Sequence, residues 1–89
     1  MIHDPFQGFA DSPTAPAESC FAVIPDDLQD LPRATKALYV GTGGDVTLVA
    51  LNDSGTTVFR NVAGGSILDV RARAVKLTGT TASDIVGLA

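Results

Sequence analysis

The sequence predicts an all-β fold: a small antiparallel β-sandwich or barrel of about six strands, preceded by an extended N-terminal arm. β-Branched residues are dense in several short segments, as packing on a pleated sheet favours. Glycine pairs and an Asp-Ser-Gly turn signal separate these segments at regular intervals. The expected strands span residues 19–24, 36–41, 45–52, 56–62, 67–78 and 83–88.

The N-terminal segment 1–18 differs from the rest of the chain, and we expect it to be an extended arm on a β-sandwich body of residues 19–89. Three of the five prolines fall in this segment, and it shows neither a strand period nor a helix period. Phe6 and Phe9 are two of only five aromatic residues in the chain. Two large apolar side chains in such an arm indicate docking on a neighbouring molecule or on the body itself.

The segment 45–52 is apolar at both strand parities. Because side chains alternate between the two faces of a strand, both of its faces should be covered, either by a second layer or by another subunit. Val49 and Leu51 lie on one of these faces. They are therefore candidate interface residues.

The long segment 67–78 changes parity, since its apolar positions alternate up to Ala74 and then continue at Val75. Such a change requires a bulge or a bend near residue 74. Arg71 and Arg73 are two positions apart before this point, so they should point the same way, toward solvent or a partner. We count both arginines among the candidate interface residues.

Length and charge restrict the function classes. A domain of 89 residues buries only about 60–65% of its unfolded surface, which makes self-association a plausible additional support. The net charge of −4 argues against nucleic-acid binding. Neither a signal peptide nor an apolar stretch of membrane-spanning length is visible, so we expect no membrane contact and synthesis in the cytoplasm.

Residues that carry chemistry are scarce. His3 is the only histidine and Cys20 the only cysteine, which leaves neither a catalytic triad nor an intrachain disulfide. We expect Cys20 to be a buried, inert thiol. Asp26, Asp27 and Asp30 lack the pattern of a calcium loop and are expected to form turns or caps. No catalytic, cofactor-binding or metal-binding residue is therefore assigned.

Two small-residue stretches also have structural interpretations. The glycine-rich residues 41–44 resemble a phosphate-binding loop, but neither the Gly-Lys-Ser/Thr signature nor a helix follows, so we expect a β-turn. Residues 78–84 combine hydroxylated side chains with one glycine, which favours a tight turn before a last strand.

The motifs of the chain resemble a known family. Leu38-Tyr39-Val40-Gly41-Thr42-Gly43-Gly44-Asp45-Val46, Val58-Phe59-Arg60-Asn61-Val62-Ala63-Gly64-Gly65 and Thr78-Gly79-Thr80-Thr81-Ala82-Ser83-Asp84-Ile85-Val86 are similar to segments of the spike-base proteins of bacterial gene transfer agents and related tailed phages. The stretches Asp4-Pro5-Phe6 and Asp30-Leu31-Pro32-Arg33 are similar too. The resemblance implies a β module that assembles on the capsid's five-fold vertices and carries a protruding fibre.

The expected function is therefore structural: the base of a head spike, a pentameric ring that anchors a fibre in the head of a phage-like particle. The implied partners are further copies of the chain, a capsid protein and a spike fibre protein. The candidate interface residues are Phe6, Phe9, Val49, Leu51, Arg71 and Arg73. The alternative is a stand-alone surface module that binds a carbohydrate or a receptor. The absence of Trp and the single Tyr argue against this alternative, and an enzyme is a more remote third class.

Overall fold

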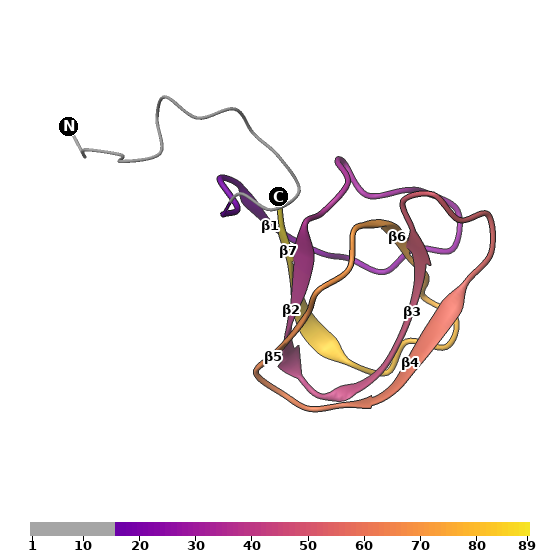
Figure 1. The fold of residues 1–89 in the computed structure, drawn as a ribbon. Helices are drawn as coiled ribbons and strands as arrows, with labels where there is room; N and C mark the ends of the chain where they lie inside the picture. Colours follow the sequence, from indigo (N-terminus) through magenta and orange to yellow (C-terminus); the bar gives the residue numbers. More distant parts are fainter. Residues whose placement is uncertain (1–15) are drawn as a thin grey trace.

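The computed structural model describes residues 16–89, which form seven strands and no helix. The strands make two antiparallel sheets, a four-stranded sheet in the order β1-β7-β2-β5 and a three-stranded sheet in the order β4-β3-β6. The two sheets face one another (Figure 1). This arrangement confirms the predicted all-β, antiparallel fold. The strand bounds are β1 (Cys20–Ala22), β2 (Ala37–Thr42), β3 (Gly44–Ala50), β4 (Thr57–Val62), β5 (Ser66–Leu68), β6 (Ala72–Val75) and β7 (Ser83–Leu88).

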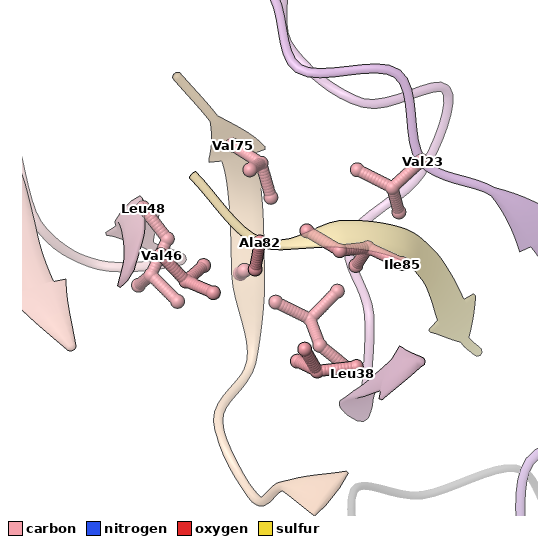
Figure 2. Packing of buried hydrophobic residues seen from close by; sticks show 9 residues of the cluster. Val23, Leu38, Val46, Leu48, Val75, Ala82 and Ile85 are labelled. Atoms are coloured by element: carbon pink, nitrogen blue, oxygen red, sulfur yellow. The ribbon is translucent and has the colours of Figure 1, made fainter. Parts of the chain in front are cut away.

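The core lies between the sheets. Leu38 on β2 and Ile85 on β7 point toward Leu48 on β3 and Val75 on β6 (Figure 2). All four side chains are at most 3% exposed, as expected for inward positions of two facing sheets. Other members of the cluster are Val23, Val40, Val46, Ala72 and Ala82.

One edge of the sandwich is built from backbone-to-backbone contact between two corners. The chain turns from β2 into β3 at Gly43 and from β4 into β5 at residues 63–65. A Cβ atom on Gly43 would lie 2.5 Å from the Val62 carbonyl oxygen and 2.8 Å from the Gly64 nitrogen. Any side chain at position 43 would therefore push the corners apart. The β-turn predicted for residues 41–44 is not formed: Gly41 and Thr42 end β2, Gly44 begins β3, and Gly43 alone connects the two sheets.

The prediction of a single strand over residues 67–78 is wrong. Its residues form β5 and β6, which belong to different sheets, and residues 69–71 carry the chain from one sheet to the other. The predicted irregularity near residue 74 is confirmed, because the β3–β6 register shifts between Val49↔Ala74 and Ala50↔Ala72. Arg73 is the extra residue at this shift. Its insertion explains the change in apolar parity.

The first expected strand, 19–24, is shorter in the structure, and the expectation that Cys20 is buried is wrong. β1 has three residues, and Cys20 is exposed. Phe21 points inward and packs against the core cluster, next to Gly87. Cys20 and Ala22 therefore face outward, because side chains alternate along the strand.

The first described residues are attached beside the end of β7. The backbone nitrogens of Glu18 and Ser19 donate to the Ala89 carbonyl oxygen at 2.7 and 2.8 Å, and the Ala89 nitrogen donates to Ser19. The Lys36 ammonium donates to the Pro16 carbonyl oxygen at 3.2 Å. The segment 1–15 therefore joins the body next to β1, β7 and the start of β2.

Candidate interaction surfaces

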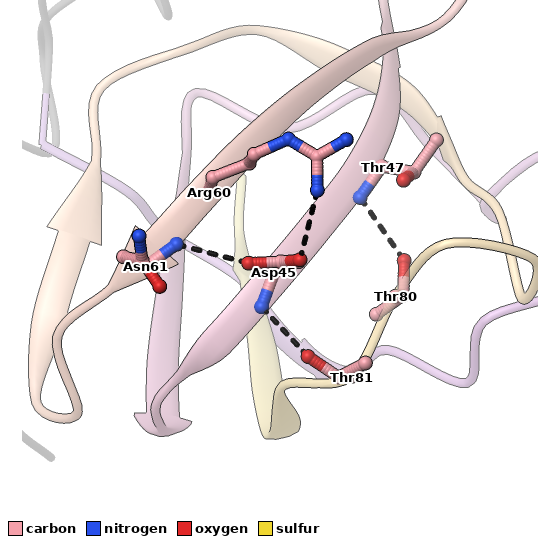
Figure 3. Close-up of polar contacts among 6 residues, drawn as sticks. All are labelled: Asp45, Thr47, Arg60, Asn61, Thr80 and Thr81. Carbon is pink, nitrogen blue, oxygen red and sulfur yellow. Dashed lines mark hydrogen bonds and ion pairs between the residues drawn. The ribbon is translucent and has the colours of Figure 1, made fainter.

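Asp45 at the start of β3 connects three segments of the chain (Figure 3). Its carboxylate accepts a hydrogen bond from the Asn61 backbone nitrogen at 3.0 Å and forms an ion pair with Arg60 at 3.3 Å. Its own backbone nitrogen donates to the Thr81 hydroxyl at 2.8 Å. The carboxylate spans the irregular β3–β4 register between Gly44 and Val46, where Asn61 adopts a positive φ of 56°. Asp45 therefore has a structural role.

The hydroxyl-rich sequence forms the predicted turn, at residues 76–82, and this turn is also fastened to β3, which the sequence does not predict. The Thr80 hydroxyl accepts from the Thr47 backbone nitrogen at 3.0 Å and donates to the Lys76 carbonyl oxygen at 2.6 Å. Gly79 lies against the Thr47 side chain with a positive φ of 89°. These contacts place the turn beside the outward-facing residues of β3.

The loop from Val23 to Thr35 runs along the free edge of β6. The backbone nitrogens of Asp26, Leu31 and Thr35 donate to the carbonyl oxygens of Val75, Arg73 and Ala72, respectively, at 2.8–3.0 Å. The loop thereby satisfies edge carbonyls of β6 that would otherwise be open to another strand. In the described residues, the sandwich is closed on this side by its own chain.

The acidic residues of this loop form turns and anchors. The Asp26 carboxylate accepts from the backbone nitrogens of Leu28 and Gln29 at 2.7 and 3.2 Å, as the predicted turn former would. The Asp27 carboxylate accepts from the hydroxyl and the backbone nitrogen of Thr78 at 2.7 and 2.9 Å. The hydrogen bond from the Thr78 hydroxyl is the main cause that lowers the pKa of Asp27 below its ordinary value of 3.8.

The two candidate arginines contact their own chain. The Arg73 guanidinium binds both carboxylate oxygens of Asp30 at 3.0–3.2 Å and the Asp53 carbonyl oxygen at 3.1 Å. Arg71 is exposed, and its Nε donates to the Thr35 carbonyl oxygen at 3.4 Å. Arg73 therefore fastens the loop 23–35 to β6, whereas the exposed Arg71 keeps surface that a partner could contact.

The two candidate residues of β3 differ. Val49 is 2% exposed, so its own chain already covers it and it offers no surface to a partner. Leu51, just beyond the strand, is half-buried. The expectation that Val49 is an interface residue therefore does not hold. β3 is apolar on both faces because both faces lie inside one chain.

The structure instead reveals an apolar face that the sequence reasoning missed. On the outward side of the four-stranded sheet, Tyr39 lies opposite Ile67 on β5 and Val86 on β7, and Val86 lies opposite Ala22 on β1. A second row places Leu88 opposite Ala37 and Cys20. We call these seven residues the outer sheet face. None of them carries a formal charge, and Ile67 and Tyr39 are 59% and 38% exposed.

A sequence signal for this face exists in the expected strands. Segment 36–41 holds Ala37 and Tyr39 at one parity and Leu38 and Val40 at the other, so it is apolar on both faces, as is the segment 83–88. Both segments therefore carry the same signal as residues 45–52, an apolar set at each parity, and this signal indicates that the outward face of their sheet also needs a cover.

Further exposed apolar side chains lie in the loops. Ile24 and Leu28 are 80% and 93% exposed, and Leu77 is 61% exposed. An open groove between β1 and the loop 23–35 is lined by Ala22, Ile24, Asp26, Gln29, Asp30, Leu31 and Pro32. The groove shares Ala22 with the outer sheet face.

A metal site and a membrane-spanning helix are two features that residues 16–89 do not contain. In this part of the chain, no three His, Cys, Asp or Glu side chains gather closely enough to hold a metal ion. The same residues include no helix with the length and apolarity that a bilayer crossing demands. Phe6, Phe9 and His3 lie outside the described residues.

Comparison with known proteins finds similarity among solved structures. The sequence matches no protein-family model and no curated protein. Among solved structures, it is similar to a chain of a structure described as the capsid of a native GTA (gene transfer agent) particle computed with C5 symmetry. The TM-score is 0.85 and the sequence identity 38%, and the match covers 98% of this chain and 100% of that chain.

A match of this identity over nearly the whole of both chains extends beyond the fold. Together with the all-β architecture, it defines a structural component of a virion-like particle. The chain belongs to the family of gene transfer agent structural proteins.

Proposed function

We propose that this protein forms the base of a head spike: a pentameric ring that sits on a five-fold vertex of a gene transfer agent capsid and anchors a fibre. The observation that carries the proposal is the full-length match to a chain of a gene transfer agent capsid computed with C5 symmetry. A closed ring of identical copies requires heterologous contacts, in which two different surfaces of the chain meet. The protein would act by adhesion, without a catalytic step.

The surface of residues 16–89 presents apolar and arginine side chains that could form such contacts. Leu51 and the exposed Arg71 remain available beside β3 and β6, and the outer sheet face provides apolar area on the opposite sheet. The apolar side chains Phe6 and Phe9 are the proposed anchors of the arm. Aromatic residues and arginine are enriched among the residues that dominate binding energy at interfaces, which favours these positions.

The test is reconstitution on capsids that lack this protein. Purified full-length chain is added to particles from a strain without its gene, and occupancy is measured by co-sedimentation and by cryo-electron microscopy of the vertices. We expect density confined to the five-fold vertices, with about five copies at each. Fibre protein should then bind only to particles that carry the ring.

Two arm variants sharpen this experiment. Deletion of residues 1–10, or the double change Phe6→Ser and Phe9→Ser, should lower capsid affinity by about tenfold or more while the β body stays folded. Gln7→Ser is the matched control and should bind normally. Binding away from the vertices, or no binding at all, would contradict the spike-base proposal. Glycan or receptor binding by the isolated chain would instead support a stand-alone binding module.

A further inference from the structure

The outer sheet face is an uncommon feature for a small sandwich. Outward positions of antiparallel sheets are normally polar when they meet water. Here four strands contribute apolar or sulfur-bearing side chains in two aligned rows, and Ile67, Tyr39, Ala22 and Cys20 are exposed. Contiguous apolar surface of this kind normally marks a docking site. The question is what occupies it before the chain meets a partner.

The point at which residues 1–15 join the described body indicates a candidate occupant. Residues 1–15 join the body at Pro16, whose carbonyl oxygen binds Lys36 next to Ala37, while Glu18 and Ser19 bind Ala89 next to Leu88. Ala37 and Leu88 belong to the second row of the outer sheet face. Residues 1–15 therefore join the body at the border of the outer sheet face.

The length and composition of the segment suit the face. Six residues lie between Phe9 and Pro16, and the seven Cα-to-Cα steps from one to the other can span about 23–25 Å when extended. Four neighbouring strands extend over only about 14 Å. The segment carries Ile2, Phe6 and Phe9, whose apolar side chains can pack on an uncharged surface if Asp4 and Asp11 keep their carboxylates in water.

We propose that, in the unassembled chain, residues 1–15 fold back in cis and cover the outer sheet face, with Phe6 and Phe9 as the covering side chains. A short tether keeps its own segment at an effective concentration of about millimolar, which exceeds that of any other copy in a dilute solution. The arm thus shields the apolar face until a partner displaces it. The proposal concerns the free chain and does not depend on the ring.

The face contains its own two probes. Cys20 is the only cysteine and Tyr39 the only tyrosine in the chain, and both belong to the outer sheet face. The experiment measures the alkylation rate of Cys20 by iodoacetamide at one fixed pH, and the quenching of Tyr39 fluorescence by acrylamide. Four forms are compared: the full-length chain, a chain without residues 1–15, the double variant Phe6→Ser/Phe9→Ser, and the matched control Gln7→Ser.

We expect the deletion and the double variant to react about tenfold faster at Cys20 than the full-length chain, which corresponds to about 1.4 kcal/mol of docking free energy. Tyr39 should become more quenchable in the same two forms, and Gln7→Ser should behave as the full-length chain. Circular dichroism checks that all four share the β fold.

A concentration series distinguishes the possible occupants. Cover in cis predicts equal protection of Cys20 at every protein concentration, because the contact is intramolecular. Equal rates in all four forms would overturn the proposal. Protection that increases with concentration would also overturn it and assign the face to a second copy, and protection that appears only after capsid is added would assign the face to the capsid.

Discussion

Residues 16–89 cover the outward side of β3 in the three-stranded sheet, but they leave the outward face of the four-stranded sheet open. On β3 of the three-stranded sheet, Thr47 and Val49 are 5% and 2% exposed. On the four-stranded sheet, the outward residues Tyr39 and Ile67 remain 38% and 59% exposed. The turn 76–82 lies along β3 and accounts for part of the difference. A strand that is apolar at both parities is therefore expected to be buried on both faces. Whether the same chain buries the second face depends on the path of the loops that connect its strands.

The difference in burial between β3 and the outer sheet face is tested most directly by placing the same charge on each. We expect Val49→Asp to cost about 4 kcal/mol or more, because a carboxylate would be buried without a partner, and such a cost approaches the whole stability of a small domain. Ile67→Asp should leave the protein folded, since that position is exposed. Urea unfolding followed by circular dichroism measures both. Similar losses in the two variants would show that the faces do not differ.

The cover on β3 can be tested at Gly79. Its φ of +89° is unfavourable for other residues, and a Cβ atom would lie 2.5 Å from the Thr47 Oγ1. Gly79→Ala should therefore lower the free energy of unfolding by about 1–3 kcal/mol. Gly55→Ala is the matched control, because a Cβ atom there would meet nothing within 4 Å. If both changes had the same effect in urea unfolding, the turn would not press on β3.

The smallest expected change in stability concerns Asp27, whose carboxylate anchors the turn 76–82. Hydrogen bonds from Thr78 lower the pKa of Asp27 in the folded state, so ionised Asp27 stabilises the fold. This contribution is fully present above the ordinary pKa of 3.8 and is lost as the pH falls through the lower folded-state pKa. Asp27→Asn should flatten the acid limb of the stability curve.

Urea unfolding from about pH 6 to about pH 2.5 measures this effect, with linkage giving the expected sign. Asp53→Asn, at an exposed acid of the β3–β4 loop, is the matched control. An acid limb that is unchanged in Asp27→Asn would contradict the role of this carboxylate as an anchor.

Local chemistry made much of the fold predictable. β-Branched segments and glycine turns located the strands, and the bulge at Arg73 followed from the parity change between Ala74 and Val75. The passage of residues 69–71 between sheets was not predictable, because a chain that leaves one sheet for another keeps the same apolar alternation. Only the pairing of Leu38↔Leu68 and Ala50↔Ala72 reveals that β5 and β6 have different neighbours.

The candidate surface was less predictable than the fold. The apolar pattern on both faces of its strand makes Val49 a candidate, but sequence alone does not show that the turn 76–82 returns to β3. Arg73 was expected on an open face, whereas Asp30, 43 positions away, binds it. Such contacts depend on tertiary proximity, which no local pattern encodes. The resemblance of the motifs correctly indicated a structural protein of gene transfer agents, and the assignment to the spike base stays a proposal.

The central position of β7 has a consequence for synthesis. β7 lies between β1 and β2, and its register joins Cys20 to Leu88 across most of the chain. A ribosome releases β7 after the other six strands, so β1 has no strand partner and the four-stranded sheet cannot close until then. Such sequence-distant pairing makes folding slow. The nascent chain must therefore keep this sheet incomplete, with its apolar segments open to chaperones or aggregation, until β7 has been made.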